Sequence, residues 1–465
     1  MKKIFNFKKL QLGLMILYTS IIVSCSKFVE VADPIDQLTK DFVFSDSTST
    51  EGTVVGIYSN AGSLYGFLAK NITLYSGLSA DEFVNYTPNS EYDVYANNEL
   101  TSQNIFYWYY PYNVIYSCNT VIQSLSNSSI TETQKNRLIG ECKFMRALNY
   151  FYLVNLFGGV PLAVTDDYKI NRLLPRADTT IIYNQIVSDL QDAKSKLSTT
   201  YVGSDKTRAN KCAATALLAR VYLYRKDYTN AAKEASEIIN TGTYSLSNLS
   251  NVFLFNSSEA IFQFTAPTNQ SSVTSDASSF VPYSSTTYPT FLIRDGLLGA
   301  FESGDQRRSN WIKSSTISGK TYSYPYKYKI YSVTTGSSMP EGTVLLRLAE
   351  LYLIRAEALA QQNDLVNAIK DLDVIRNRAG LSLIGTTAPS INKQALLDTI
   401  DHENRIEFFA ECGHRWLDLK RLGKADAVLG ALKPATWQTT DQLYPIGSDI
   451  LLADPNVTQN PGYTQ

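Results

Sequence analysis

Two helical hairpins with the same residue pattern most constrain what this chain can fold into. In residues 213–224, small residues lie on one side of a helix and Leu, Val and Tyr on the other, and a polar turn at Lys226-Asp227 leads into a returning helix. Residues 345–378 repeat the plan around Asn363-Asp364. Small residues let two helices approach closely, and large ones pack against the next pair. The pattern predicts a mainly α fold.

Helical periodicity continues over much of the remaining chain, and its interruptions define the expected organisation. It occurs in residues 106–125, 132–156, 179–197 and 398–419. The stretch 250–341 is dominated by Ser, Thr, Gly, Pro and Tyr, which predicts an irregular, loop-rich insertion with a short strand at 322–328. Residues 430–465 carry four prolines and are predicted to be a loop-rich tail. Residues 51–465 are therefore expected to form one body of tetratricopeptide-like helical hairpins.

The amino terminus has the layout of a lipoprotein signal peptide. Four lysines precede an apolar run at residues 10–23, and the small-residue segment that follows ends in Cys25. Residues 1–24 are expected to be removed, and the Cys25 sulfur to carry the acyl chains that hold the protein to a membrane. The polar residues 25–50 are expected to act as a tether.

Two other interpretations of this segment are an uncleaved anchor helix and an ordinary secretory signal in which Cys25 is incidental. A spanning helix needs about 20 apolar residues. Only fourteen residues lie between Lys9 and Ser24, so the lipoprotein interpretation is favoured.

Charge and cysteine content exclude several classes of protein. Without the four lysines of residues 1–24, the 42 basic and 43 acidic residues leave a net charge of about −5, so binding to nucleic acid is not expected. Cys118, Cys142, Cys212 and Cys412 form no CxxC pair and no cluster at metal spacing. They are predicted to be buried, unpaired thiols, with a disulfide between Cys118 and Cys142 as the alternative.

The chain lacks the common catalytic motifs. His402-Glu403 begins like a zinc-protease helix, but Ile406 stands where the second histidine would have to lie. No GxSxG motif accompanies His414, and no phosphate-binding glycine loop occurs. The charged residues of this region are instead expected to form ion pairs at helical spacing; they are Glu403, Arg405, Glu407, Glu411 and Arg415.

Two acidic doublets could supply carboxylates for catalysis. They are Asp81-Glu82 and Asp166-Asp167. Adjacent residues of an extended segment point in opposite directions, so neither doublet forms a catalytic pair by itself. We interpret both as solvated loop charges. A glycosidase with carboxylates from distant segments remains an alternative.

Tyrosine is the unusual component of the composition, with 31 residues against 20 Phe and 4 Trp. Tyr86, Tyr92 and Tyr95 fall in a polar stretch that also holds four asparagines. Sugar rings present apolar faces to aromatic rings and hydroxyl edges to amides, so this mixture indicates carbohydrate binding. The alternative is a set of surface tyrosines that support a long loop.

Together these residues resemble the SusD/RagB family of surface glycan-binding lipoproteins of the Bacteroidetes. The matching segments cover nearly the whole chain in order. They are Cys25, Trp108-x3-Tyr112-x2-Ile115-x3-Asn119, residues 141–147 and 156–162, 219–223 with Asp227-Tyr228, 305–308, 347–358, 403–408, Arg415-Trp416-x-Asp418-Leu419-x-Arg421, 443–446 and 459–463.

The resemblance implies a mainly α, SusD-like fold and a non-catalytic protein that captures oligosaccharide or a similar nutrient, such as peptide. No cofactor and no metal ligands are expected from the residues, and bound calcium is left open. The resemblance also implies lipid attachment at the outer membrane, facing outward, and a SusC-like TonB-dependent transporter as partner, which imports the captured ligand. The ligand surface of the family cannot be transferred by motif. As a hypothesis about position, we name Asp81, Tyr86, Tyr92, Tyr95, Tyr283 and Tyr288 as ligand-binding residues.

Three hypotheses remain open at this stage. The first is the glycan-capturing surface protein, and the second is a lipoprotein glycoside hydrolase with dispersed carboxylates. The third is a helical scaffold that binds only its membrane partner. The first accounts best for the leader, the hairpins and the missing catalytic motifs together.

Overall fold

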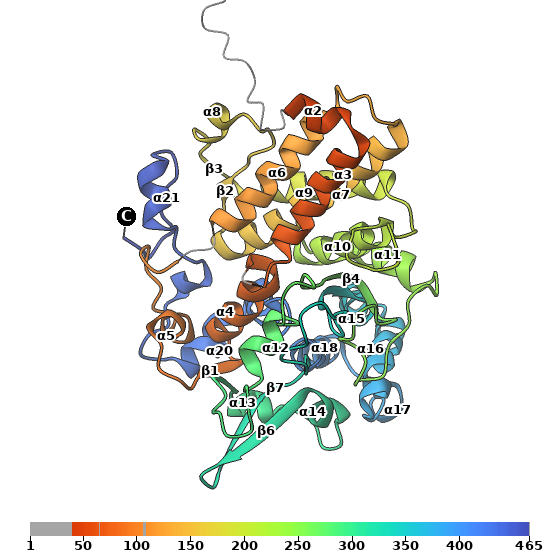
Figure 1. The fold of residues 1–465 in the computed structure, drawn as a ribbon. Coiled ribbons are helices and arrows are strands. Elements are labelled where there is room, and N and C mark those ends of the chain that lie inside the picture. The colour runs from red at the N-terminus through yellow and green to blue at the C-terminus, as the bar shows by residue number, and fades with distance from the viewer. Residues whose placement is uncertain (1–39, 65, 106–107, 465) are drawn as a thin grey trace, which may run out of the picture. The chain divides into compact units, whose positions relative to one another are not determined.

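The computed structural model describes residues 40–64, 66–105 and 108–464 (Figure 1). The expected signal peptide, Cys25 and residues 25–39 of the expected tether lie outside these ranges. The chain divides into two units after Val43, and the second is Phe44–Gln465. No helix within the described ranges combines the length and the apolar character that crossing a membrane requires.

The end of the expected tether is helical. Residues 40–50 lie in α2 (Lys40–Ser45) and α3 (Ser47–Ala61), so the prediction of a polar tether is wrong for this part. Asp46 caps α3 by accepting a hydrogen bond from the Ser49 backbone N–H at 2.7 Å. The segment is rich in Ser and Thr and therefore did not suggest a helix. The helix forms because it is capped at its start and buries Val54 and other apolar residues further along.

Consecutive helices pack side by side to form the framework. The predicted helices are confirmed as α6 (Tyr109–Leu125), α7 (Glu132–Phe157) and α9 (Thr179–Lys196). Contacts join α6 to α7, α7 to α9, and α9 to the first hairpin. The four cysteines of the described residues are buried free thiols, as predicted.

Both predicted hairpins are confirmed. The first is α10 (Lys211–Tyr224) with α11 (Tyr228–Ile239), and the second is α15 (Leu348–Gln361) with α16 (Leu365–Ala379). Although more than a hundred residues separate them in sequence, α11 packs directly against α15. The helices therefore form one continuous stack, from which the insertion projects.

The two hairpin turns have the same construction. Lys226 (φ 60°) and Asn363 (φ 66°) adopt the left-handed conformation that ends a helix, and the next residue in each turn is an aspartate. Asp227 and Asp364 each cap the following helix by accepting from a backbone N–H three residues on, at 3.2 and 3.3 Å. The repeated turn explains why both hairpins close alike.

The insertion is more regular than predicted. The strand predicted at 322–328 is present as β7 (Lys320–Pro325), and the insertion holds six further short elements. They are β4 (Ala260–Phe264), α12 (Ser275–Phe280), β5 (Phe291–Ile293), α13 (Asp295–Leu298), α14 (Gln306–Trp311) and β6 (Ile312–Ile317). Strand β4 pairs antiparallel with β8 (Thr343–Arg347), and β6 pairs with β7. The predicted tail also contains short helices.

The remaining elements are short, except for α18 in the carboxyl-terminal part. They are η2 (Phe67–Asn71), α4 (Ile72–Ser79), β1 (Phe83–Asn85), α5 (Ser90–Asn97), β2 (Val160–Pro161), α8 (Tyr168–Asn171), β3 (Arg176–Ala177), α17 (Ile384–Thr387), α18 (Lys393–Glu407), α19 (His414–Arg421), α20 (Ala425–Leu432), η3 (Thr439–Gln442) and α21 (Ser448–Ala453). Strand β1 pairs with β5, and β2 with β3.

The helix predicted over 398–419 is broken between α18 and α19. Ala410, Cys412 and Gly413 have positive φ values of 54°, 46° and 70°, which a right-handed helix cannot contain. The break leaves the Glu407 carbonyl at a helix end, where Lys327 Nζ donates to it at 2.7 Å. Buried cations thus replace the missing helical hydrogen bonds.

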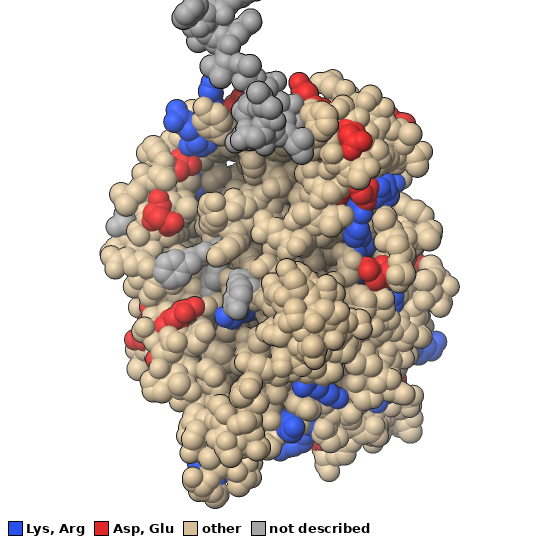
Figure 2. Space-filling model, in the orientation of Figure 1, with Lys and Arg blue, Asp and Glu red and all other residues tan. Residues whose placement is uncertain are grey.

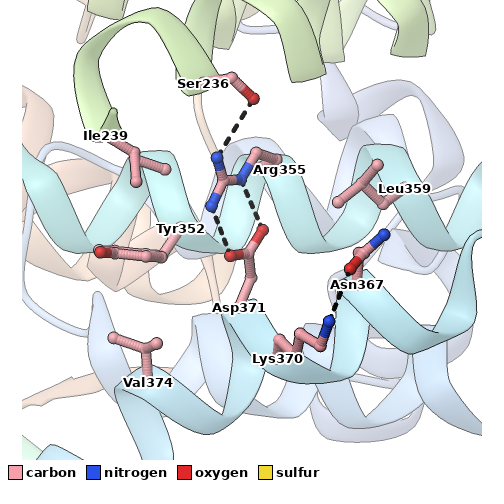
Figure 3. Close-up of a pocket in the computed structure, with 9 residues that line it drawn as sticks. All are labelled: Ser236, Ile239, Tyr352, Arg355, Leu359, Asn367, Lys370, Asp371 and Val374. Atoms are coloured by element: carbon pink, nitrogen blue, oxygen red, sulfur yellow. Dashed lines mark hydrogen bonds and ion pairs between the residues drawn. The ribbon is translucent and has the colours of Figure 1, made fainter. Parts of the chain in front are cut away.

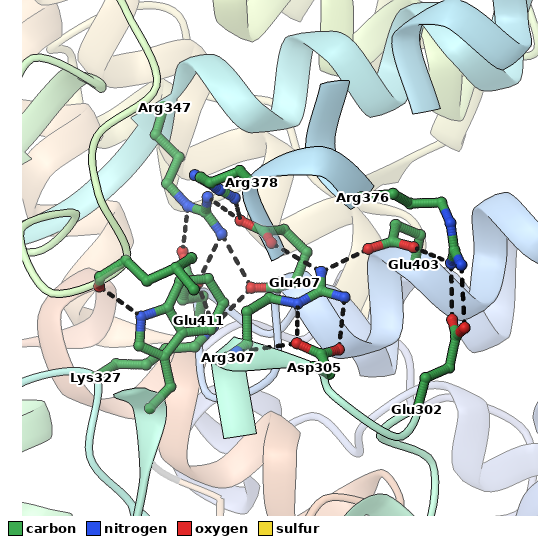
Figure 4. Close-up of polar contacts among 12 residues, drawn as sticks. Glu302, Asp305, Arg307, Lys327, Arg347, Arg376, Arg378, Glu403, Glu407 and Glu411 are labelled. Atoms are coloured by element: carbon green, nitrogen blue, oxygen red, sulfur yellow. Dashed lines mark hydrogen bonds and ion pairs between the residues drawn. The ribbon is translucent and has the colours of Figure 1, made fainter. Parts of the chain in front are cut away.

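A buried ion-pair network lies where the insertion meets the helical stack (Figure 4). At its centre, Arg347 donates to Glu259 at 2.8 Å, to Glu407 at 2.6 Å and to Glu411 at 2.8 Å. These side chains are almost wholly inaccessible to solvent. Three carboxylates around one guanidinium need further cations, and the insertion supplies two of them.

Those two cations bracket the β6–β7 hairpin. Arg307, just before β6, contacts Asp305 at 2.8 Å, Glu403 at 2.6 Å and Glu407 at 3.0 Å. Lys327, just after β7, pairs with Glu411. Both ends of the hairpin are therefore tied to charges carried by the helical stack.

Removing one charge from the network should destabilise the protein strongly. Burial alone would raise the pKa of Glu407, but the guanidinium groups of Arg378, Arg347 and Arg307 hold it well below its usual value. We expect Glu407→Gln to lower the free energy of unfolding by about 3–5 kcal/mol, since it leaves buried cations unpaired. Urea denaturation at pH 7 measures the loss, which should shrink as the pH falls below about 4.5, because the unfolded wild-type chain then binds a proton that folded Glu407 does not.

The matched control is Asp398→Asn, which removes an exposed carboxylate that lies 3.2 Å from Lys424. It should change the stability by less than about 1 kcal/mol. Equal effects of the two substitutions would contradict a dominant role for the network.

Candidate ligand-binding surface

Three strands bring together the tyrosines that define the candidate site. Strand β1 pairs with β5 in the register Asn85↔Phe291, and β5 packs against β7. Just beyond β1, the Tyr86 N–H donates to the Thr290 carbonyl at 2.8 Å and extends this pairing. The result places Tyr86, Tyr288 and Tyr322 in mutual contact, and we call these three residues the tyrosine cluster.

The rings of the tyrosine cluster hold one another in place. The centroids of Tyr86 and Tyr288 lie 5.7 Å apart in a stacked arrangement, and Tyr322 meets both rings edge-on at 5.0 and 5.3 Å. The Tyr86 hydroxyl donates to that of Tyr322 at 3.1 Å. Tyr322 is 5% exposed whereas Tyr288 is 40% exposed, so the buried ring supports the one that meets solvent.

Polar groups surround the tyrosine cluster. Asn85 Nδ2 donates to Asp93 at 2.7 Å, while its Oδ1 has no hydrogen-bond partner among the described residues. Ser284 and Thr287 form an exposed hydroxyl pair at 2.9 Å in the segment before Tyr288. Lys320 Nζ lies 5.4 Å from the Tyr322 ring centroid. Asn85 Oδ1 is buried, so the groups that a ligand can reach are the apolar ring face, the hydroxyls and the ammonium group, which suit a ligand that is apolar on its faces and polar at its edges.

The structure brings only some of the predicted ligand-binding residues to this surface. Tyr86 and Tyr288 lie together, as described. Tyr283 is 77% exposed, and its ring contacts that of Tyr331 at 5.7 Å. Tyr322, which the hypothesis omitted, completes the cluster. Its place in an alternating strand could have suggested it, but the pairing with Tyr86 across 236 residues could not be read from sequence.

Two of the predicted tyrosines pack on rings outside the tyrosine cluster. Tyr92 packs on Phe291 at 4.9 Å, and Tyr95 packs on Tyr75 at 4.5 Å and on Tyr444 at 5.8 Å. Tyr95 is 1% exposed, so its ring is not presented to solvent.

Tyr92 and Tyr95 both lie on helix α5. Asn89 caps α5 by accepting from the Glu91 backbone N–H at 2.9 Å, and Asn98 (φ 58°) ends it. These asparagines, which suggested sugar contacts, instead serve as helix caps.

The acidic doublet at 81–82 is buried, so its interpretation as solvated loop charge is wrong. Asp81 accepts a bidentate pair of hydrogen bonds from Arg415 at 2.7 and 2.9 Å and pairs with Arg405 at 2.8 Å. Glu82 accepts from the Ala410 N–H at 3.3 Å. Asp167 of the other doublet is exposed and caps α8. Asp81 therefore lies outside the candidate surface, committed to two arginines.

A concave region lies on the helical stack, and no residue of the tyrosine cluster lines it. It is a groove of about 470 Å³ between α11, α15 and α16 (Figure 3). Arg355, its central cation, donates to Asp371 twice at 2.7 Å and to Ser236 at 3.2 Å. Because these charges already satisfy one another, we place the candidate site at the tyrosine cluster.

We also considered whether the described residues could bind a metal ion. No group of three or more His, Cys, Asp or Glu side chains among them is arranged to hold one. His414 stacks on Phe408 at 4.6 Å.

Comparison with known proteins gives this architecture a family. Residues 27–223 match a family model described as "Starch-binding associating with outer membrane", and residues 300–463 match one described as "SusD family". The chain belongs to the SusD/RagB family. The two matched segments include Tyr86 and Tyr322, and Tyr288 lies in the stretch between them.

Relatives in this family are distant but extend over most of the chain. A SusD-like protein of Formosa agariphila is 26% identical, with 94% of each chain covered. The starch-binding protein SusD of Bacteroides thetaiotaomicron is 25% identical over 72% of this chain and 74% of its own. A SusD-like crystal structure from Bacteroides fragilis, 21% identical, covers 93% of this chain and 100% of that one with a TM-score of 0.77. This last likeness confirms the mainly α, SusD-like fold.

The residues that carry the SusD/RagB resemblance lie mostly in the framework. Arg146 of α7 donates to Asp189 of α9 at 2.8 and 2.6 Å and to Asn119 of α6 at 2.6 Å. Arg220 of α10 donates to Glu350 of α15 at 2.7 Å. These buried pairs join neighbouring helices of the stack.

Glu82 should make stability depend on pH. Burial, and then the adjacent Asp81 carboxylate, raise the pKa of Glu82 to about 8. The folded state therefore keeps a proton that the unfolded chain releases above pH 4.5, and stability falls by up to about 1.4 kcal/mol per pH unit from there to pH 8. Glu82→Gln mimics the protonated acid and should remove this fall, so its stability relative to wild type should rise from pH 5 to pH 8.

Urea denaturation at pH 5, 6.5 and 8 tests this expectation, with Asp167→Asn as an exposed control. A difference between Glu82→Gln and wild type that stays constant with pH would contradict it.

Proposed function

We propose that this protein binds oligosaccharide at the tyrosine cluster without cleaving it. The observation that carries the proposal is the half-exposed ring of Tyr288, which Tyr86 and Tyr322 hold with its polar neighbours around it. A sugar ring can stack on such a face while its hydroxyls bond to the polar rim. The starch-binding name of the Bacteroides thetaiotaomicron relative supports this class of ligand.

The absence of cleavage is supported by how the nearby carboxylates are used. A glycosidase needs two carboxyl groups that face the substrate from opposite sides, about 5–10 Å apart. Asp81 is committed to two arginines, Glu91 accepts from the Tyr75 hydroxyl, and Asp93 accepts from Asn85. Release of reducing ends from a bound polysaccharide would instead favour the hydrolase hypothesis.

We further propose that the protein acts at the outer membrane, anchored through Cys25 and facing outward, and delivers its ligand to a SusC-like TonB-dependent transporter. The signal-peptide layout and the outer-membrane description of the matched family model support this placement. Residues 1–24 would be removed, and the chain from Cys25 to the first described helix would link anchor and body. Co-purification of a transporter without any glycan binding would favour the scaffold hypothesis.

Tyr288→Ala should weaken glycan binding while leaving the fold intact, since the ring is half exposed and the substitution removes the stacking face. We expect Kd to rise about tenfold for the polysaccharide that wild type binds, which corresponds to about 1.4 kcal/mol. Affinity electrophoresis against a panel of soluble polysaccharides, starch among them, identifies that polymer, and titration calorimetry measures Kd.

Tyr168→Ala is the matched control, because Tyr168 is exposed on α8 and is not part of the cluster. Unchanged binding by Tyr288→Ala would place the site elsewhere. Retardation by no polysaccharide would remove the support for glycan capture.

Cys25→Ala should abolish retention at the membrane without changing affinity, since the thiol carries the anchor and not the site. Membrane fractionation and surface proteolysis of cells that express the full chain measure retention, and calorimetry on the released protein measures Kd. A membrane-retained Cys25→Ala variant would show that something other than lipid holds the protein there.

A further inference from the structure

Two lysines share the face of the β6–β7 hairpin that carries Tyr322. In the hairpin register, Lys313 lies opposite Tyr324 and Lys320 opposite Ile317. Directly opposed residues of an antiparallel pair project to the same face, as do alternate residues of one strand. Lys313, Lys320, Tyr322 and Tyr324 therefore share one face, on which Tyr322 meets Tyr86 and Tyr288.

Both lysines lie over aromatic rings, and no carboxylate of the described residues pairs with either of them. Lys320 Nζ is 5.4 Å from the Tyr322 centroid, and Lys313 Nζ is 4.7 Å from that of Tyr326. Both residues are exposed, and neither forms an ion pair with a carboxylate within the part of the chain that the structure describes. A cation held over a ring keeps its charge available to a ligand that binds beside that ring.

The surrounding sequence is free of acidic residues. Residues 306–340 contain six Lys and Arg and no Asp or Glu, and residues 277–294 contain no Asp or Glu either. In Figure 2, blue side chains gather with little red over the part of the surface that Figure 1 assigns to β6 and α14. On the neighbouring α5, Asp93 accepts from the Asn85 amide and Glu91 from the Tyr75 hydroxyl, and both donors are neutral. Arg307 and Lys327 of this stretch are neutralised in the buried ion-pair network, so the local positive charge comes from the exposed Arg308, Lys313 and Lys320.

The hairpin holds these charges in a defined position. Ser318 (φ 51°) and Gly319 (φ 78°) form a tight tip with two positive φ values, the geometry that matches the twist of paired strands. At its base, Arg307 and Lys327 tie the hairpin into the buried ion-pair network. Lys320 is thus placed beside the tyrosine cluster before any ligand binds, which lowers the entropy cost of binding.

We propose that the ligand of the tyrosine cluster is an anionic glycan, with carboxylate or sulfate groups that pair with Lys320 and Lys313 while a sugar ring stacks on Tyr288. This inference rests on the proposed function and names its class of ligand. Four residues along a strand separate the two lysine positions, a distance of about 13 Å. The ligand therefore spans more than one sugar ring.

The test compares polysaccharides in matched pairs that differ only in charge. Polygalacturonate and its methyl ester probe carboxylates, and dextran sulfate and dextran probe sulfate esters. Calorimetry with the full chain in detergent, at 50 and 200 mM NaCl, should show that the charged member of at least one pair binds tenfold tighter or more. That preference should weaken at the higher salt concentration.

Variants separate this site from general attraction to a polyanion. Lys320→Gln and Lys313→Gln should each raise Kd for the charged polymer three- to tenfold. Lys320→Arg keeps the positive charge, so its Kd should stay close to that of wild type. Lys169→Gln on α8 is an exposed control that should change nothing. Tyr288→Ala should weaken binding of the same polymer, because stacking and charge act on one ligand.

Three outcomes would overturn the inference. Equal or tighter binding of the neutral members would leave the protein a glycan binder with an uncharged ligand. Charged-polymer binding that survives in the Lys313→Gln/Lys320→Gln double variant would place the anion site elsewhere. Binding to neither the pairs nor the wider panel would remove the proposed function together with the inference.

Discussion

The arrangement of this protein depends on a group of charges buried where the insertion meets the helical stack. Arg347 is surrounded by the carboxylates of Glu259, Glu407 and Glu411, and the insertion completes the charge balance through Arg307 and Lys327. Ions without water must find partners, since an unpaired buried charge costs several kcal/mol. The partners come from segments far apart in sequence, so the network can form only when those segments are correctly assembled.

This requirement connects stability to the proposed site. The β6–β7 hairpin has an exposed hydroxyl-rich face and would be marginal by itself, because a two-stranded hairpin buries little apolar surface. Its two flanking cations, Arg307 and Lys327, anchor it. The face that carries Tyr322 then brings this ring into contact with Tyr86 and Tyr288. A loop-rich insertion can thereby present a rigid aromatic surface, and the lysines at either end of that face give the surface its charge.

Local features were predictable where they depend on neighbours in sequence. The hairpins at 213–240 and 345–378 follow from apolar periodicity and from capping aspartates, and both are present. Features that depend on distant partners were not. Glu403, Glu407 and Glu411 were expected to pair along one helix, but they reach Arg307, Arg347 and Lys327 instead. Asp81 looked like a solvated loop charge until Arg415, more than three hundred residues away, proved to be its partner.

By itself, the sequence determined the mainly α class, the two hairpins with their turns, the family and the layout of the amino terminus. Each of these depends on residue spacing within a few turns of helix or on short motifs in order. Only the tertiary structure decided which tyrosines gather, that Tyr95 is buried while Tyr288 is exposed, and which charges neutralise one another. Those outcomes depend on contacts between β1, β5 and β7, and such contacts are set by packing and desolvation across the whole fold.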